Sequence, residues 1–533
     1  MNLFVKFWSM ENKQTSSTSS RVFKSSLKLA GATLISRILG LVREQVQAAV
    51  FGASGLTDAF NVAYRIPNML RDLFAEGAFS PAFVPVFMEA KIEGSNVARR
   101  LLWSVFLLLL VLTIIIGILM VIFANEIVSQ IAPKFLEDPA KFQITVTLLR
   151  IMSPFLSLVS IAALFMGALN AIKIFFVPAL APASYNVVMI LAILCLPPVF
   201  AKHGIMGIYA LGLGAVVGGF LQIVVQIPLI IKKSLGPLGP VKIISPYTKK
   251  IAGRMGLAFV GVSASQVNIF INTLLATGTV VGAVSWMTYA FRLFQFPLGI
   301  LGVSIGGSNL VHFSDAWKAG KRSEALTLLK SSYLLSLFTI CWALTMLYTM
   351  SIPTVHLIFE RGAFLRSDTL AVSELLKYYL WCLPCYGLFK IFSPTFYSID
   401  KPQVPVFISL FSIFVNIVVC LTFVPRYGYT ILAMGVSISI IVNTLLQIVF
   451  LTRYLDLPKI FFLDLKLLKI ALAVAFAGTL THYLTLNYFS YETIFINKLI
   501  TFVVIGCLGS LSYFLILFFT GEGKFLRKMV KRK

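Results

Sequence analysis

Long apolar stretches alternate with short polar segments along most of the chain. The apolar runs are about 20 residues long, enough for a helix to cross a hydrocarbon layer of ~30 Å. The pattern predicts about fourteen spans, near residues 27–50, 57–88, 101–124, 142–169, 177–199, 204–231, 250–276, 280–312, 325–350, 370–399, 403–424, 428–452, 464–486 and 495–519. The first, second and eighth carry charges, so hydropathy alone would find about eleven or twelve.

Composition excludes a soluble fold. The chain has 533 residues, of which 58% are hydrophobic and 12% charged, whereas a soluble domain carries about 25% charged residues. A membrane β-barrel would instead show alternating segments of ~10 residues. The predicted fold class is therefore an all-α integral membrane protein.

The net charge of +25 reports membrane topology rather than nucleic-acid binding, because the basic residues cluster in alternate loops. Such loops face the cytoplasm, which predicts cytoplasmic N- and C-termini and an even number of spans. The basic loops include Lys91, Arg99, Arg100, Lys173, Lys232, Lys233, Lys249, Lys250, Lys318, Lys321, Arg322 and Lys401.

An internal repeat relates two halves of the chain. Stretches about 230 residues apart are similar, and the matched residues are Pro154 with Pro384, Asn170 with Asp400, and Asn186 with Asn416. The motif KHG at 202–204 likewise matches RYG at 426–428. Since each half has six predicted spans, both enter the membrane with the same polarity, which predicts two lobes related by a pseudo-twofold axis along the membrane normal.

The repeat also predicts the domain boundaries. We expect a polar cytoplasmic N-terminus, an N-lobe of six spans, a cytoplasmic inter-lobe loop rich in Gly, Pro and Lys, a C-lobe of six spans, two further spans outside the repeat, and a basic cytoplasmic tail. These segments are residues 1–24, 25–232, 233–249, 250–453, 454–519 and 520–533, respectively.

Charged side chains inside predicted spans are costly and usually face a cavity. At 100° per residue, the polar residues of the first span fall within an arc of about 120°: Thr33, Ser36, Arg37, Gly40, Arg43, Glu44 and Gln47. Those of the second fall within about 140°: Asp58, Asn61, Arg65, Asn68, Arg71, Asp72 and Glu76. Pro67, Pro81 and Pro85 predict a bend in this second span.

The eighth span carries Ser285, Arg292, Gly299 and Gly306 at every seventh position, which places them on one face. Five arginines thus come from three spans in both halves, and guanidinium groups bind diphosphates in a bidentate manner. This favours an anionic headgroup as ligand. The alternative is that acids and arginines form structural pairs, such as Arg43 with Glu44 or Arg71 with Asp72, and for Asp72 we favour it.

No catalytic or energy-coupling motif accompanies these charges. The chain has no phosphate-binding loop of the GxxxxGK[ST] type, and its four histidines show no metal-ligand spacing. Cys382 and Cys385 form a CxxC inside an apolar run, which is typical of buried small residues. The chain is therefore predicted to be a transporter and not an enzyme, without a cofactor, driven by the membrane potential or a monovalent cation.

Three motifs give the chain a specific resemblance: SRILGLVRE from residue 36, FGASGLTDAFNVAYRIPNMLRDLFAEGAFSPAFVPVF from residue 51, and SWMTYAFRLFQFPLGILGVSIG from residue 285. In these the chain resembles the MurJ/MviN family of lipid II flippases, within the multidrug/oligosaccharidyl-lipid/polysaccharide exporter superfamily. The resemblance covers essentially the whole chain.

The resemblance implies a two-lobed transporter of the bacterial inner membrane. It would move undecaprenyl-pyrophosphate-linked disaccharide pentapeptide to the periplasmic leaflet by alternating access, for peptidoglycan synthesis and cell shape. The implied partners are lipid II, membrane lipids and the peptidoglycan synthesis machinery. The last two spans would form a groove for the lipid tail. By motif position, the implied cavity residues are Arg37, Arg43, Asp58, Asn68, Arg71, Ser285 and Arg292, to which the polar stripe adds Arg65 and Glu76.

Two departures from the family pattern lie beside Arg292. Phe291 stands where the family often has an acid, and Gln295 where some members have glutamate. Because these acids are absent, we expect the charge of Arg292 to be less neutralised and the cavity to be more positively charged. Asp400 and Asn416 are candidates for a cation site in the second lobe.

Two alternatives remain open. One is a cation-coupled drug or polysaccharide-repeat-unit exporter of the same superfamily, and the other is a membrane scaffold that binds without transporting.

Overall fold

The computed structural model describes residues 31–77, 79–239, 242–299, 312–458, 461–462 and 464–522, and these residues form helices and connecting loops without a β-strand. They divide into two compact units. Unit 1 holds the described residues up to Phe51 and Gly55–Val267, and unit 2 holds Gly52–Ser54 and those from Asn268 onward. The boundary lies inside one helix, α10. The predicted N-terminus, 1–24, and the tail beyond residue 522 lie outside the described residues.

Unit 1 begins with a helical segment over residues 31–51. Its other elements are α2 (Gly55–Arg71), the π-helix η1 (Asp72–Gly77), α3 (Phe79–Glu93), α4 (Ser95–Ile122), α5 (Ala124–Ile131), the 3₁₀-helix η2 (Pro133–Glu137), α6 (Pro139–Ala171), α7 (Phe176–Lys202), α8 (Tyr209–Val224), α9 (Ile227–Lys232) and the first part of α10 (Pro246–Thr277).

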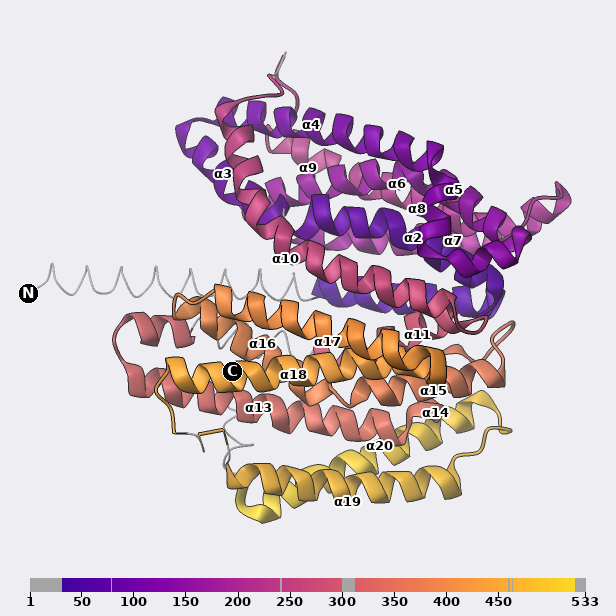
Figure 1. The fold of residues 1–533 in the computed structure, drawn as a ribbon, viewed down its shortest axis with the longest axis vertical. Coiled ribbons are helices and arrows are strands. Elements are labelled where there is room, and N and C mark those ends of the chain that lie inside the picture. Colours follow the sequence, from indigo (N-terminus) through magenta and orange to yellow (C-terminus); the bar gives the residue numbers. More distant parts are fainter. Residues whose placement is uncertain are drawn as a thin grey trace, which may run out of the picture. The chain divides into compact units, whose positions relative to one another are not determined.

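Helix α6 is the central helix of unit 1. It packs against α2, α3, α4 and α8 (Figure 1), and 78% of its most apolar stretch is buried, against 28% for α4. The outer face of α4 exposes Ile114, Ile115 and Ile118. An apolar helix that is half uncovered by protein is what a lipid-facing position requires.

Unit 2 contains the rest of α10, α11 (Ala283–Pro297), a short helical segment over 312–318, α13 (Arg322–Thr349), α14 (Ser351–Phe359), α15 (Arg366–Leu380), α16 (Leu383–Ser398), α17 (Gln403–Tyr427), α18 (Thr430–Tyr454), α19 (Leu465–Tyr488), α20 (Phe495–Leu517) and the π-helix η4 (Phe518–Glu522). Helix α13 packs against α15, α16, α19 and α20. The last two long helices, α19 and α20, lie side by side (Figure 1).

Nine helices of the described residues are long and apolar enough to cross a membrane. The other predicted spans coincide with helices that are charged or interrupted: the segment 31–51, α2 with α3, α10, α11, and α15 with α16. The all-α membrane fold class is thereby confirmed. The count of fourteen spans and the domain boundaries stay predictions.

The two units repeat local features. Helices α7 and α8 pack together in unit 1, as α17 and α18 do in unit 2. Gly204 follows α7 and Gly428 follows α17, with φ of 68° and 73°. Such left-handed backbone at a helix end favours glycine because a side chain would clash. The matched KHG and RYG motifs therefore each place a glycine of positive φ just after the corresponding helix.

Candidate functional site: the charged stripes of the two units

The second part of the polar stripe of residues 31–51 faces the interior of unit 1. Glu44 and Gln47 are 2% and 4% exposed, whereas Leu34, Ile35 and Ile38 are 46–48% exposed. Thr33 and Arg37, nearer the start of the described segment, are exposed. The predicted polar face is therefore buried around Glu44 and Gln47 and open around Arg37.

Arg43 is held on two sides and keeps one donor unused. Its Nη2 donates to Glu44 Oε1 at 3.0 Å, and its guanidinium lies 5.7 Å from the centre of the Tyr185 ring on α7. The Tyr185 hydroxyl in turn lies 3.1 Å from that of Tyr64 on α2. Arg43 Nε is buried and has no hydrogen-bond partner among the described residues. A buried guanidinium with an unused N–H is prepared to bind an anion, because a phosphate oxygen would satisfy that donor.

Asp58 lies near the start of α2, where it is 2% exposed. Its Oδ2 is 3.7 Å from Nζ of Lys141, which is near the start of α6. The ammonium group of Lys141 also lies 3.9 Å from the centre of the Phe135 ring. Sequence reasoning did not find this pair, since no local pattern connects residues so far apart. The structure gives the Asp58 carboxylate a partner between two helices of unit 1.

Asn68 and Arg65 lie further along α2, and both are partly buried. The amide oxygen of Asn68 is buried without a hydrogen-bond donor among the described residues. Arg65 has interactions of its own. The spacing of Asp58, Arg65 and Asn68 places them on one side of α2, on different turns.

Arg71 ends α2 and donates from Nε and Nη2 to Asp72 Oδ1 at 3.2 and 2.8 Å. Gln266 of α10 reaches the other oxygen of Asp72 at 3.4 Å. The structural pairing that the sequence favours for Asp72 is therefore formed. The Asp72 carboxylate, which also accepts from Gln266, orients the Arg71 guanidinium.

The second predicted span changes helix type at Asp72. The π-helix η1 covers Asp72–Gly77, while Pro67 and Pro85 lie inside α2 and α3. A Cβ on Gly77 would lie 2.5 Å from the Asp72 carbonyl oxygen and 2.9 Å from Val262, so only glycine fits there. The interruption therefore lies between the predicted prolines. The side chain of Glu76 lies outside the described part of the chain.

In unit 2, Ser285 is fully buried and Arg292 partly buried, both on α11. Both have interactions within the protein. Phe291 packs between Phe294 and Tyr379, with ring centres 5.8 and 5.5 Å away. Where the family often has an acid, this chain thus has part of an aromatic cluster. Gly299 is described, and Gly306 lies outside the described residues.

The two residues of the candidate cation site lie apart. Asp400 is exposed just after α16, whereas Asn416 is buried about 20 Å along α17 from its first residue. The Asn416 amide donates to Asn268 Oδ1 at 2.6 Å and to Asn272 Oδ1 at 3.2 Å on α10. Asn416 therefore belongs to an amide cluster that sequence reasoning did not find, and Asp400 does not contribute to it.

Asn186, the repeat partner of Asn416, makes the corresponding contact in unit 1. Its amide donates to the Ser36 carbonyl oxygen at 3.2 Å, and it lies against Gly40. Each matched asparagine thus ties a helix of its unit to the first long helix of that unit's predicted lobe.

Among the described residues no group of three or more His, Cys, Asp or Glu side chains could hold a metal ion. Cys382 is fully buried and Cys385 partly buried, and both are free thiols, in agreement with the interpretation of the CxxC as buried small residues.

Comparison with known proteins identifies the family. The family described as lipid II flippase MurJ matches residues 47–502. A probable lipid II flippase MurJ of Rhizobium meliloti is 35% identical over 420 residues, covering 78% of each chain. The lipid II flippase MurJ of Burkholderia cenocepacia is 33% identical over 473 residues, or 88% of this chain and 91% of that protein.

Solved structures agree. A lipid II flippase MurJ in an inward closed conformation superposes with a TM-score of 0.77 at 25% identity, over 94% of this chain and 99% of the other. A multidrug resistance MATE family transporter shares the fold alone, with a TM-score of 0.66 at 13% identity over 81% of this chain and 98% of that chain. The chain therefore belongs to the lipid II flippase MurJ family, a family of multi-pass membrane transporters and not of enzymes.

Proposed function

We propose that this chain is a lipid II flippase of the bacterial inner membrane. It moves undecaprenyl-pyrophosphate-linked disaccharide pentapeptide from the cytoplasmic to the periplasmic leaflet by alternating access. Family membership supports the substrate, and the clustering of lysines and arginines in alternate loops supports cytoplasmic termini.

We further propose that the arginines bind the pyrophosphate headgroup. The observation that carries this proposal is the buried Arg43 Nε, which has no partner among the described residues. A buried unsatisfied N–H costs about 1–3 kcal/mol, and a phosphate oxygen would recover that energy. Ser285 and Arg292 are proposed to serve the same headgroup from the C-lobe.

The lipid tail is proposed to lie against α20, the second of the last two long helices. A groove of about 530 Å³ runs between α13, α14 and α20, lined mostly by apolar side chains such as Trp342, Met346, Phe502 and Phe514. An unbranched or prenyl hydrocarbon fits such a surface, because it needs no hydrogen-bond partner.

A drug exporter that recognises cations finds less support. Such a site needs acids that are available to a cationic ligand. In unit 1, Glu44 is paired with Arg43, Asp58 with Lys141, and Asp72 with Arg71.

The test is an assay of lipid II accessibility in cells whose own flippase is depleted. An impermeant reagent that degrades lipid II from the periplasmic side reports flipping, with and without the membrane potential. We expect Arg43→Ala and Arg292→Ala to leave precursor on the cytoplasmic side while both proteins insert normally.

The exposed Arg150 on α6, which donates to the Val121 carbonyl oxygen, offers a matched control as Arg150→Ala. Normal delivery of precursor by both Arg43→Ala and Arg292→Ala would overturn the headgroup proposal. Loss of flipping on collapse of the membrane potential would identify that potential as the driving force.

A further inference from the structure

A second basic site lies in unit 1 at the predicted cytoplasmic end of its helices. It is a cavity of about 240 Å³ where α3 ends, α4 begins, α6 connects to α7, and α9 leads into the inter-lobe loop. We call it the lysine pocket, and it is lined by Lys91, Ser95, Ala98, Ile172, Ile174, Lys233 and Leu235. Its volume is far above the 10–15 Å³ or so that a single water needs.

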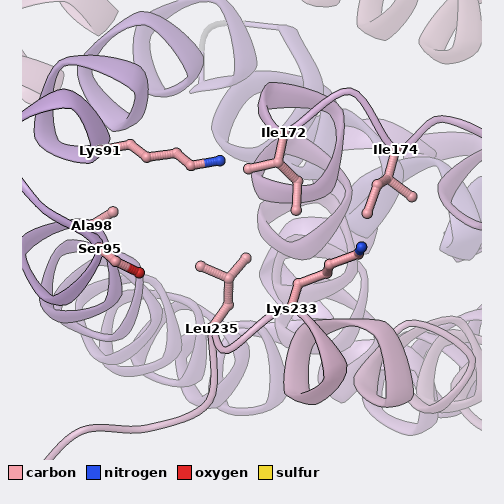
Figure 2. Close-up of a pocket in the computed structure, with 7 residues that line it drawn as sticks. All are labelled: Lys91, Ser95, Ala98, Ile172, Ile174, Lys233 and Leu235. Atoms are coloured by element: carbon pink, nitrogen blue, oxygen red, sulfur yellow. The ribbon is translucent and has the colours of Figure 1, made fainter.

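The pocket carries positive charge without compensation. In Figure 2, Lys91 and Ser95 enter from one side and Lys233 lies on the other. No carboxylate lines the cavity, and neither lysine side chain forms an ion pair or a hydrogen bond with another described residue. The nearby Glu89 is engaged by Lys250 and Arg254. Two ammonium groups around one hydroxyl are suited to a phosphate oxygen.

The walls of the pocket are fixed by contacts that do not use the lysines. Trp103 of α4 donates from Nε1 to the Leu235 carbonyl oxygen at 2.8 Å, and Arg99 donates from Nε to that of Gly236 at 3.0 Å. The side chains of Leu235 and Ala98 are buried in the apolar core of unit 1. The inter-lobe loop is therefore anchored on α4 before any ligand arrives, so binding does not have to order it.

Apolar side chains surround the charged groups. Ile172 and Ile174 line the cavity, while Ile92 and Ile231, neighbours of the lysines in sequence, are 84% and 63% exposed. A free inorganic anion gains nothing from such a surface. A lipid gains from both parts, since its headgroup meets the lysines and its acyl chains meet the isoleucines at the ends of the spans.

We propose that the lysine pocket binds the phosphodiester headgroup of an anionic phospholipid, at a site separate from the arginine stripes. Basic pockets between helix ends on the cytoplasmic side suit such headgroups. The proposal does not depend on the transported substrate, because none of its residues lies on the stripes.

The test measures lipid binding to the detergent-purified full chain by native mass spectrometry, with phosphatidylglycerol, phosphatidylethanolamine or inorganic phosphate added in turn. We expect a preferred phosphatidylglycerol site that phosphatidylethanolamine does not fill. Lys91→Ala/Lys233→Ala should weaken it roughly 30-fold, since each lysine near a membrane surface contributes about fivefold.

Lys134→Ala/Lys202→Ala removes two exposed lysines from other loops of unit 1 and should leave the site intact, as should Lys91→Arg/Lys233→Arg. Lys91→Gln/Lys233→Gln keeps side chains of similar size without the charge and should lose binding like the alanine pair, which guards against a folding defect. Equal phosphatidylglycerol affinity in the wild type and both charge-removing pairs would overturn the proposal. Displacement of the lipid by millimolar phosphate would assign the pocket to a free anion instead.

Discussion

The two units use matched asparagines on similar helices but surround them differently. In unit 1, Asn186 contacts Ser36 and Gly40; in unit 2, Asn416 contacts Asn268 and Asn272. Both contacted pairs are four residues apart, so each asparagine meets one turn of a helix. The scaffold contact is therefore shared, and the difference between the units lies in what the rest of the contacted helix carries.

Counting along each helix from that shared contact, Arg43 and Glu44 of unit 1 correspond to Leu275 and Ala276 of α10. The helix of unit 1 has a buried ion pair at these positions, whereas α10 of unit 2 has apolar side chains there. Because the contact persists without the charges, the charges are not needed to hold the helix in place. The comparison teaches that the ion pair of unit 1 is an addition to the scaffold, and we expect it to serve transport.

The largest effect is expected from removing the Arg43–Glu44 ion pair. Arg43→Ala/Glu44→Ala leaves no orphan charge, so folding should persist. Lipid II flipping should fall by up to about 100-fold, because the charge-assisted hydrogen bond of ~1.5–3 kcal/mol that Arg43 Nε offers to a phosphate oxygen is lost. The accessibility assay measures this, with Leu275→Ala as the equivalent change in unit 2. Equal flipping by the two variants would remove the functional distinction between the units.

Breaking the Asp58–Lys141 pair, in contrast, should change the stability of the protein. Lys141→Ala removes the ammonium partner of a nearly buried carboxylate, which we expect to lower the free energy of unfolding by ~3 kcal/mol. Thermal unfolding of the purified protein measures it. Asp58→Asn/Lys141→Met removes both charges and should recover most of the lost free energy of unfolding. If this double variant recovers none of it, the charge of Asp58 is not the cause of the loss.

The shared asparagine contacts should differ in strength. Asn416→Ala leaves the buried Asn272 and the partly buried Asn268 amides without their donor and should cost about 1–3 kcal/mol. Asn186→Ala loses one bond to a helix carbonyl and should cost about 0.5–1.5 kcal/mol. Thermal unfolding of both variants gives the order. The reverse order would mean that the scaffold contact matters more in the charged unit.

The smallest effect is expected at carboxylates outside the spans. Burial of Glu360 would raise its pKa, but hydrogen bonds from Thr369 and His356 and the nearby Arg366 lower it below the usual 4.5. The hydrogen bond and charge of Lys250, with Arg254, lower the pKa of the exposed Glu89. A lowered pKa means that the stabilisation is complete above 4.5 and is lost as pH falls through the folded-state value.

Glu360→Gln should therefore flatten the acid limb of the stability–pH curve, and Glu89→Gln should flatten it less, because solvent screens an exposed pair. Unfolding midpoints measured from about pH 7 down to about pH 2.5 compare the two. A larger change for Glu89→Gln would contradict this ranking.

Sequence reasoning reached the fold class and the polar face of residues 31–51, because helical periodicity alone determines which side chains share a face. It also raised the pairs Arg43–Glu44 and Arg71–Asp72, which are neighbours in sequence. It could not find Lys141 beside Asp58, since that contact depends on how α2 packs on α6.

It also located the break in the second span imperfectly. Prolines are the visible signal for a bend, whereas the change to a π-helix at Asp72–Gly77 depends on the close packing of Gly77 against Val262. Asp400 and Asn416 are candidates for one cation site by sequence, but positions along a chain give no distance between two side chains.

The repeated asparagine contact also bears on how a duplicated chain can diverge. A hydrogen bond that holds the helix, made by Asn186 in one unit and Asn416 in the other, leaves the neighbouring turns open to mutation. Charges can then be gained or lost one residue at a time without unfolding the unit that carries them. One copy can acquire a new ligand while the other keeps an apolar helix, so the duplication supplies a tolerant background on which selection for a different cargo can act.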